Sequence, residues 1–252
     1  MSKPHLPGDS ISRMATDLAQ RIRWEVEHGS PGYPSVERSA VSAVAADPVR
    51  EHNGVVSPTQ DRDSALSALR AELGECTRCP LHQGRQHIVF GEGNANAKLV
   101  FVGEGPGRDE DLQGRPFVGA AGQLLSRIIQ AISLSREAVY ICNVVKCRPP
   151  NNRVPNEDEC ATCGPFMKKQ LAIIKPQVVV ALGGTAAKYL LGVEAPLGRL
   201  RGRFHDADGF EIMPTYHPAY LLRNPKGKRP VWEDMQMVAK ALGIPRVLER
   251  KT

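Results

Sequence analysis

The stretch LVFVGEGPG, residues 99–107, decides the fold of this chain. Its first four residues are apolar, as in a buried strand, and an apolar-periodic segment typical of a helix follows from about residue 120. GEGPG therefore lies in a loop between a strand and a helix. In open α/β sheets such loops lie at the carboxyl ends of the strands, where ligands bind. The glycines would let a bound group approach the backbone, although they would equally suit a loop that only turns the chain.

The rest of the sequence alternates between strands and helices. We expect strands at residues 99–102, 139–145, 178–182 and 210–213. We expect helices from about residue 63 to the first cysteine pair, at residues 120–132, at 157–174, from the Gly183-Gly184 turn to 191, and at 231–242. Strands separated by helices imply parallel βαβ units with right-handed crossovers. The sequence therefore predicts an α/β domain with about four parallel strands and helices on both faces.

The composition limits the class of protein. The chain has 252 residues, a formal net charge of +6 and a pI near 9.1. This basic balance suits a polyanionic partner such as nucleic acid, but it also fits many ordinary proteins. The sequence contains no apolar run of membrane-spanning length and no apolar signal core near its start. We therefore expect a soluble, cytoplasmic protein that does not associate with membranes.

Residues 1–62 differ from the rest of the chain. Behind the candidate cap Ser10, four apolar residues have helical spacing: Ile11, Met14, Leu18 and Ile22. This short amphipathic helix would be available to dock on the core or on a protein partner. From Gly29 to about Asp61, Gly, Pro, Ser and Ala without apolar periodicity favour a flexible linker. The sequence thus predicts that residues 63–252 form the functional domain.

In an apparently cytosolic protein, the six cysteines favour metal binding, catalysis or burial over disulfides. Cys76 and Cys79 form a CxxC pair, Cys147 follows a strand, and Cys160 and Cys163 lie in the next predicted helix. Two thiolates three residues apart can chelate one metal centre, and two more from distant loops can complete four-fold sulfur ligation. The spacing alone fits a tetrahedral zinc ion, an iron-sulfur cluster or buried thiols without a metal.

Several motifs resemble those of the family 4 uracil-DNA glycosylases, the iron-sulfur branch of the uracil-DNA glycosylase superfamily. They are GEGPG followed by EDLQGRPFVGAAGQLL, then NVVKCRPPNNR, VVVALGGTAA and PTYHPAYLLRNP. The resemblance runs in order from about residue 66 to residue 242. It implies a three-layer α/β/α sandwich with a central parallel four-stranded sheet and a [4Fe-4S] cluster. It also implies base excision repair activity that releases uracil from DNA and leaves an abasic site.

The resemblance also implies which cysteines hold the cluster. The family's ligands correspond to the CxxC pair, to the cysteine of KCRPP and to one shortly before a Pro-Phe in the following helix. Here these are Cys76, Cys79, Cys147 and, from its Cys-Gly-Pro-Phe context, Cys163. Cys160, three residues earlier, is the alternative to Cys163.

The resemblance places a base pocket around GEGPG. Asn143 follows the second strand, and its amide is the right type of group to pair with the N3 donor and O4 acceptor of uracil. Phe117 is similar to the aromatic residue that stacks on the flipped base, and His217 matches the histidine that serves the leaving base. Without the motif, Asn143 would be read as a turn residue and Phe117 as a core residue. His217 would be read as a loop histidine without a function.

The group that handles water is less defined. The GQDPY motif of family 1 enzymes supplies an aspartate, and the aligned residue here is Gly105. Glu104 is therefore the leading candidate to orient water, with Asn143 assisting, and Gly103 and Gly105 contribute backbone to the pocket. Glu110 is a second candidate, near C5 of the base, where it would exclude the thymine methyl. The motifs contain no lysine placed as a Schiff-base nucleophile, so we expect a monofunctional enzyme.

Basic and apolar residues after His217 are candidates for contact with uracil-containing DNA. Arg223 and Arg201 would bind phosphates, together with other basic residues nearby: Arg199, Arg203, Lys226, Lys228 and Arg229. Each of them would equally suit solvated surface. Leu221 or Leu222 would fill the space left by the flipped base, or pack in a helix core. We expect the protein to act as a monomer.

Two rival functions fit the same motifs. One is a superfamily glycosylase for another deaminated base, and the other is a non-catalytic nucleic-acid-binding module with a structural iron-sulfur cluster. A third branch, which traps abasic sites covalently, has a basic, histidine-containing insertion after the glycine-rich motif. The corresponding residues 109–116, DEDLQGRP, contain no histidine, which argues against that branch.

Overall fold

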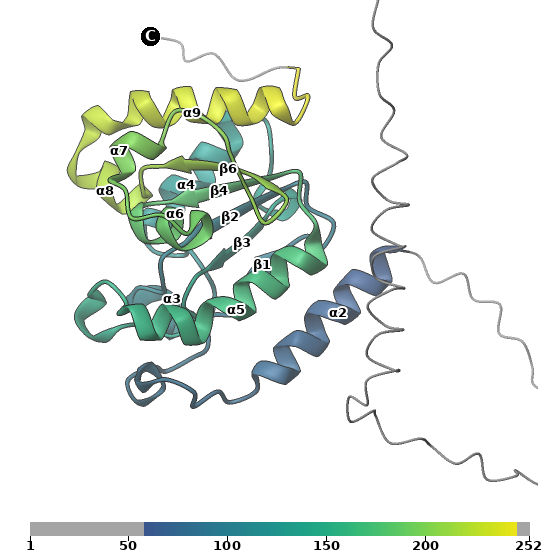
Figure 1. Cartoon of the computed structure of the whole chain (residues 1–252), viewed down its shortest axis with the longest axis vertical. Helices are drawn as coiled ribbons and strands as arrows, with labels where there is room; N and C mark the ends of the chain where they lie inside the picture. Colours follow the sequence, from purple (N-terminus) through teal and green to yellow (C-terminus); the bar gives the residue numbers. More distant parts are fainter. Residues whose placement is uncertain (1–57, 246–252) are drawn as a thin grey trace, which may run out of the picture. The chain divides into compact units, whose positions relative to one another are not determined.

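We describe residues 58–245 of the chain in a computed structural model. Within this range, six strands form one sheet with the order β1-β3-β2-β4-β6-β5 (Figure 1). The inner four are parallel: β2 (Leu99–Gly103), β3 (Tyr140–Asn143), β4 (Val178–Leu182) and β6 (Phe210–Thr215). The expected parallel four-stranded sheet is confirmed. Two short antiparallel strands that the sequence did not predict pair at its edges: β1 (Glu92–Gly93) and β5 (His205–Ala207).

Helices cover both faces of the sheet, so the three-layer α/β/α sandwich is also confirmed. One apolar cluster joins Val100 and Val102 of β2 to three helices: α2 (Pro58–Leu73), α5 (Glu157–Ile174) and α6 (Gly184–Leu191). The other joins Leu99 and Phe101 to α4 (Ala120–Ala131), α8 (Pro218–Arg223) and α9 (Lys228–Ala241). Figure 1 shows α5 and α9 on opposite sides of the strands. Burial on both faces explains why the parallel strands are continuous apolar runs.

Most expected boundaries agree with the structure, and the differences have local causes. Helix α5 has the expected bounds because Asn156 and Glu159 form a capping box at its start. The predicted strand over residues 139–145 is too long, since β3 ends at Asn143. Beyond it, the buried Val144 and Val145 donate hydrogen bonds to the carbonyls of residues 103 and 104, which keeps the loops after β2 and β3 side by side.

Several short helices were not predicted. Helix α3 (Arg108–Gln113) lies inside the loop after β2, and its charged sequence has no apolar period. It forms because the Glu110 carboxylate accepts a hydrogen bond from the Gly107 N–H at its start. The other short elements are α7 (Leu197–Leu200), η1 (Pro80–Gln83), η2 (Arg136–Ala138), η3 (Pro150–Asn152) and η4 (Pro225–Gly227). Helices α2 and α9 begin at Pro58 and Lys228, earlier than the expected residues 63 and 231.

The predicted N-terminal amphipathic helix and linker lie outside the described residues, apart from residues 58–62, which belong to α2. The proposed division of the chain at residue 62 therefore stays a prediction. Among the described helices, none has the length and apolar character needed to cross a membrane.

A buried carboxylate attaches α9 to the end of β6. Asp234 is fully buried and accepts a hydrogen bond from the Thr215 hydroxyl, at 2.5 Å. Arg201 donates to both of its oxygens, at 2.7 and 3.2 Å, and also to the carbonyl of Pro230. Removing one partner of such a pair leaves the other buried and uncompensated.

We predict that Asp234→Ala lowers the free energy of unfolding by about 3 kcal/mol or more, because Arg201 and Thr215 lose their shared acceptor. Urea denaturation measures this change. The matched control is Glu233→Ala, since the neighbouring Glu233 pairs only at the surface with Arg229 and should cost less than about 0.5 kcal/mol. Equal losses in the two variants would contradict the prediction.

Candidate active site

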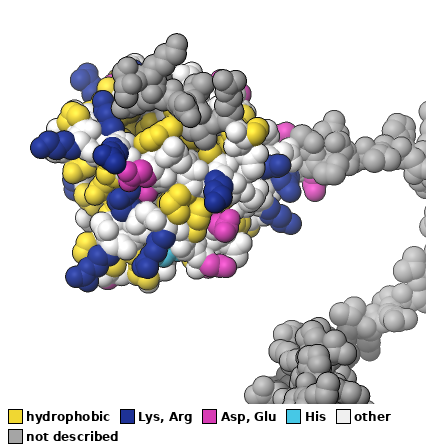
Figure 2. All heavy atoms as spheres, turned by 90° about the horizontal axis from the view of Figure 1, so that it is seen from above, with side chains coloured by type: hydrophobic (Ala, Val, Ile, Leu, Met, Phe, Trp, Pro, Cys, Tyr) yellow, Lys and Arg dark blue, Asp and Glu magenta, His cyan; other side chains and the backbone are white. Residues whose placement is uncertain are grey.

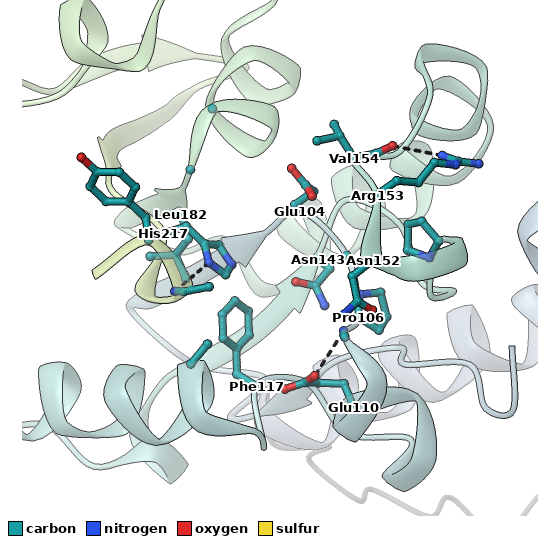
Figure 3. Close-up of a pocket in the computed structure, with 18 of the residues that line it drawn as sticks. Glu104, Pro106, Glu110, Phe117, Asn143, Asn152, Arg153, Val154, Leu182 and His217 are labelled. Atoms are coloured by element: carbon teal, nitrogen blue, oxygen red, sulfur yellow. Dashed lines mark hydrogen bonds between the residues drawn. The ribbon is translucent and has the colours of Figure 1, made fainter. Parts of the chain in front are cut away.

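A cleft of about 470 Å³ opens at the carboxyl ends of the parallel strands. The loops after β2, β3, β4 and β6 form its walls, as expected for ligand sites in open α/β sheets. Most of the predicted pocket residues line it: Glu104, Gly105, Glu110, Phe117, Asn143 and His217. Figure 3 shows Asn143, Phe117 and His217 grouped in the cleft, with Glu104 across from Phe117.

Asn143 is the last residue of β3 and is 1% exposed. Among the described residues, its buried Oδ1 atom has no hydrogen-bond partner. A buried acceptor without a hydrogen-bond partner costs about 1–3 kcal/mol of stability. Such atoms are rare in folded proteins, and a bound group that donates a hydrogen bond would remove the cost. Because this side chain lines the cleft, the arrangement suits a ligand that donates a hydrogen bond to Oδ1.

Gly103 does not line the cleft but makes its geometry possible. A Cβ atom at this position would lie 2.4 Å from Asn143 Oδ1 and 2.6 Å from Cζ of Phe117. Both distances are far below van der Waals contact. The amide and the ring can therefore approach one another only because residue 103 has no side chain.

His217 lies at the start of α8, and its ring centroid is 5.5 Å from that of Phe117. Its Nδ1 atom accepts a hydrogen bond from the Ala219 N–H at 3.1 Å, which assigns the proton of the neutral ring to Nε2. Burial lowers the pKa of His217 to about 4, while the Glu110 carboxylate raises it and the Arg223 guanidinium lowers it. The ring is thus an uncharged Nε2–H donor at neutral pH.

The two candidate carboxylates have different surroundings. Glu110 binds three backbone N–H groups: its Oε2 atom accepts from Gly107, and its Oε1 atom accepts from Val118 and Gly119 at 2.9 and 3.0 Å. These bonds fix Glu110 as part of the cleft wall. Glu104 is half-buried, and its Oε2 atom accepts a hydrogen bond from the Thr185 hydroxyl at 2.5 Å.

The structure separates the predicted DNA contacts into two groups. Arg223 is exposed at the cleft and Leu222 is 46% exposed, so both are accessible to a ligand. Leu221, in contrast, is 1% exposed and packs in the apolar cluster with α4 and α9, so of the two wedge candidates Leu221 takes the core alternative. The choice of Arg201 as a phosphate contact is corrected, because its guanidinium is directed inward to Asp234 and lies over the Tyr216 ring.

The remaining basic candidates lie at the surface. Arg199, Arg203, Lys226 and Arg229 are exposed, whereas Lys228 is half-buried. The face on the α9 side, seen in Figure 2, carries more Lys and Arg than Asp and Glu side chains. This distribution is compatible with a polyanionic ligand.

Sequence reasoning missed several residues of the cleft. Asn152 and Arg153 line it from the loop after β3, where Arg153 forms a two-point ion pair with the buried Glu159. Tyr220 also lines the cleft and stacks on Tyr216, with ring centroids 5.0 Å apart. The turn-forming PPNN sequence signalled a loop before Arg153, but the sequence did not show that the loop folds over the cleft.

Four of the cysteines line a second, small cavity: Cys76, Cys79, Cys147 and Cys163. Cys160 does not line it. Arg85 donates from Nη1 to the Cys147 sulfur at 3.4 Å and to the Cys76 carbonyl at 2.6 Å. The Lys146 N–H donates to the Cys163 sulfur at 3.2 Å. Within residues 58–245, no group of three or more Cys, His, Asp or Glu side chains is arranged to hold a single metal ion.

Lys146 connects this thiol cavity to the cleft. Its side chain is 1% exposed, and its Nζ atom donates to the Asn143 carbonyl at 2.8 Å and to Gln170 Oε1 at 2.6 Å. Gln170 in turn donates to the Tyr140 hydroxyl and the Phe90 carbonyl. The end of β3 is therefore fixed to α5, which carries Cys163, by a buried polar network.

Comparison with known proteins agrees with this geometry. Residues 90–236 match the family model described as the uracil DNA glycosylase superfamily. A type-4 uracil-DNA glycosylase of Thermotoga maritima is 48% identical over 179 residues, which cover 69% of this chain and 93% of the relative. Similar enzymes of Saccharolobus solfataricus and Archaeoglobus fulgidus are 43% and 40% identical, and the matches cover 70% and 71% of this chain and 86% and 94% of the relatives. The chain belongs to the uracil-DNA glycosylase superfamily.

Proposed function

We propose that this chain is a monofunctional uracil-DNA glycosylase, which binds a deoxyuridine flipped out of DNA and hydrolyses its N-glycosidic bond. The products are free uracil and an abasic site. The observation that carries the proposal is the buried, unpaired Oδ1 atom of Asn143 in a cleft that also holds Phe117 and His217. Membership of the superfamily and the type-4 relatives support it.

Asn143 would read the edge of the base. Its Oδ1 atom would accept the N3–H of uracil, and its Nδ2 would donate to O4. Cytosine has an acceptor at N3 and a donor at C4, so it would leave these buried groups unpaired at a cost of a few kcal/mol. Phe117 would stack on the flipped base, which must leave the DNA helix to reach the cleft.

His217 would serve the departing base. As the glycosidic bond breaks, negative charge develops on uracil near O2, and a donor aimed at that oxygen stabilises the transition state more than the ground state. The Nε2–H of the neutral His217 ring is such a donor, because Nδ1 is already occupied by the Ala219 N–H. No charge needs to be buried before the bond breaks.

Glu104 is the proposed water-orienting group, since the residue aligned with the family 1 aspartate is Gly105. Its hydrogen bond from Thr185 fixes the carboxylate in the cleft. Its negative charge would also stabilise the oxocarbenium character of the sugar. Glu110, held by three backbone N–H groups, is proposed as a fixed wall near C5 of the base.

The exposed residues around the cleft would bind the DNA. Arg223 would pair with a phosphate, and Leu222 would occupy the gap that the flipped nucleotide leaves. We propose that the protein acts on DNA as a monomer. A protein partner for the N-terminal segment stays a proposal, because that segment lies outside the described residues.

The four cysteines around the small cavity are the proposed ligands of a [4Fe-4S] cluster: Cys76, Cys79, Cys147 and Cys163. Each thiolate of such a cluster binds a different iron, so its sulfurs lie farther apart than around one zinc ion with Zn–S bonds of about 2.3 Å. All four side chains line one shared cavity, which supports them as a set of ligands. When bound, the cluster would cross-link distant segments of the chain and supply a one-electron redox centre.

A single-uracil oligonucleotide assay tests the proposed function. We expect uracil release, with strand cleavage only after alkali or heat, and no release from matched oligonucleotides with cytosine or thymine at that position. Activity on hypoxanthine instead of uracil would favour the rival glycosylase. Binding without release of any base would indicate a non-catalytic module.

We predict that Glu104→Ala lowers the single-turnover rate of uracil release by at least about tenfold, or about 1.4 kcal/mol of transition-state stabilisation. Rapid-quench kinetics with excess enzyme measures it. Glu211→Ala is the matched control, because Glu211 is exposed on β6 and does not line the cleft. A rate close to that of the wild type would remove Glu104 from the mechanism.

We predict that the His217 ring titrates near pH 4 rather than 6.5. The unfolded chain would bind the proton more readily than the folded chain, so stability is lost as the pH falls from 6.5 towards 4. NMR of labelled histidine, with the His217 signal identified by its absence in His217→Gln, measures the midpoint. A midpoint at 6.5 would contradict the neutral-donor role at neutral pH.

We predict that Cys163→Ala lowers the iron content and visible absorbance of the anaerobically purified protein, whereas Cys160→Ala keeps both. The reason is that Cys163 lines the thiol cavity and Cys160 does not. Iron and sulfide analysis measures the difference. Full iron in Cys163→Ala together with loss in Cys160→Ala would reverse the assignment.

A further inference from the structure

The proposed base-stacking residue has a strained backbone. Phe117 has φ of +52°, in the left-handed region that bulky side chains rarely adopt. Such a conformation costs about 1–3 kcal/mol and persists only where the surrounding structure enforces it. Its ring is 6% exposed and lies against His217 in the cleft. The groups that hold this backbone therefore decide where the ring lies.

Arg136 binds the peptide groups on both sides of the strained residue. This residue opens η2, just before β3, and its side chain is 19% exposed. Its Nη1 atom donates to the Phe117 carbonyl at 3.1 Å, and its Nη2 atom donates to the carbonyl of Pro116. One guanidinium thus binds the carbonyls of two consecutive residues.

Glu92 orients that guanidinium. Its Oε1 atom accepts from Nε and Nη2 of Arg136 at 2.9 and 2.7 Å. Arg115 binds the same carboxylate from a more exposed position, and its side chain is 59% exposed. Glu92 lies on β1, the short antiparallel edge strand. Pairing of this strand with β3 therefore fixes the carboxylate that orients Arg136.

The peptide that follows Phe117 has further contacts besides the one from Arg136. Glu110 accepts the N–H groups of Val118 and Gly119, the two residues that follow the strained position. A Cβ atom at Gly122 would lie only 1.8 Å from the Phe117 carbonyl oxygen, so the helix backbone also encloses this peptide. Arg136 is therefore the side chain that opposes relaxation of the preceding peptide.

We propose that Arg136 is a positioning residue for base removal, which acts by holding Phe117 in the conformation that presents its ring to the flipped base. This inference rests on the proposed function. Arginine suits the role because its planar guanidinium binds a carboxylate on one edge and two carbonyls on the other. A lysine would provide a single charged point and would not bind all three groups in fixed directions.

Single-turnover uracil release by a double-mutant cycle tests the proposal. We expect Arg136→Met to lower the rate by about tenfold in the wild-type background and by less than about twofold in the Phe117→Ala background. A purely structural role would lower the rate by the same factor in both backgrounds. Arg136→Lys should recover little of the loss. Arg115→Met is the matched control, because it removes an arginine from the same Glu92 carboxylate without touching the carbonyls, and it should react within about twofold of wild type.

A second readout does not depend on catalysis. We expect 4-fluorophenylalanine at position 117 to give one sharp ¹⁹F resonance in the wild-type chain and a shifted or broadened one with Arg136→Met. Should Arg136→Met fail to fold, Glu92→Gln loosens the same guanidinium and should produce smaller changes in the same direction. An unchanged resonance, a wild-type rate in Arg136→Met, or equal losses in both backgrounds would overturn the proposal. Absence of uracil release by the wild type would instead overturn the proposed function, and the ¹⁹F result would still decide the positioning role.

Discussion

The cleft depends on one steric constraint, the missing side chain at Gly103. This residue ends the central strand β2, and a Cβ atom there would overlap both the Asn143 amide and the Phe117 ring. Asn143 ends β3, whereas Phe117 lies in the loop between α3 and α4. In the proposed function, one must reach the edge and the other the face of the same flipped base. A close approach of this kind is available only beside a glycine. The constraint fixes the distance between the group that would read the base edge and the group that would stack on it.

Buried polar contacts then hold three of the cleft's walls in place. Lys146 binds the Asn143 carbonyl, Arg136 binds the Phe117 carbonyl, and Asp234 binds the Thr215 hydroxyl two residues before His217. Buried polar groups are costly without hydrogen-bond partners, and losing one partner leaves the other unsatisfied. Alternative loop positions would therefore leave a buried polar group without its partner. These contacts give the cleft the rigidity that the proposed stacking and edge recognition would require.

Local sequence patterns predicted the framework. The continuous apolar runs predicted the four parallel strands, and the helix expected at about residues 157–174 corresponds to α5. Strand-end loops also predicted where the functional side chains would gather, because the carboxyl ends of parallel strands meet at one sheet edge. Asn143 and His217 lie at that edge for this reason, although only their motif context separated them from ordinary loop residues.

Contacts between residues far apart in the sequence decided the remaining features of the site, and no short sequence pattern encodes such contacts. Strand β1 has two residues, too few for a period, yet it supplies the Glu92 carboxylate to an arginine 44 positions away. Arg201 and Leu221 are residue types that often contact DNA, but both face inward. Arg201 pairs with the buried Asp234 carboxylate of α9, and Leu221 packs on the apolar surface of the same helix. The sequence by itself determined the strands, the helices and the edge at which a ligand binds. Only the tertiary structure decided which charges are exposed and which are buried, since that depends on partners brought together by folding.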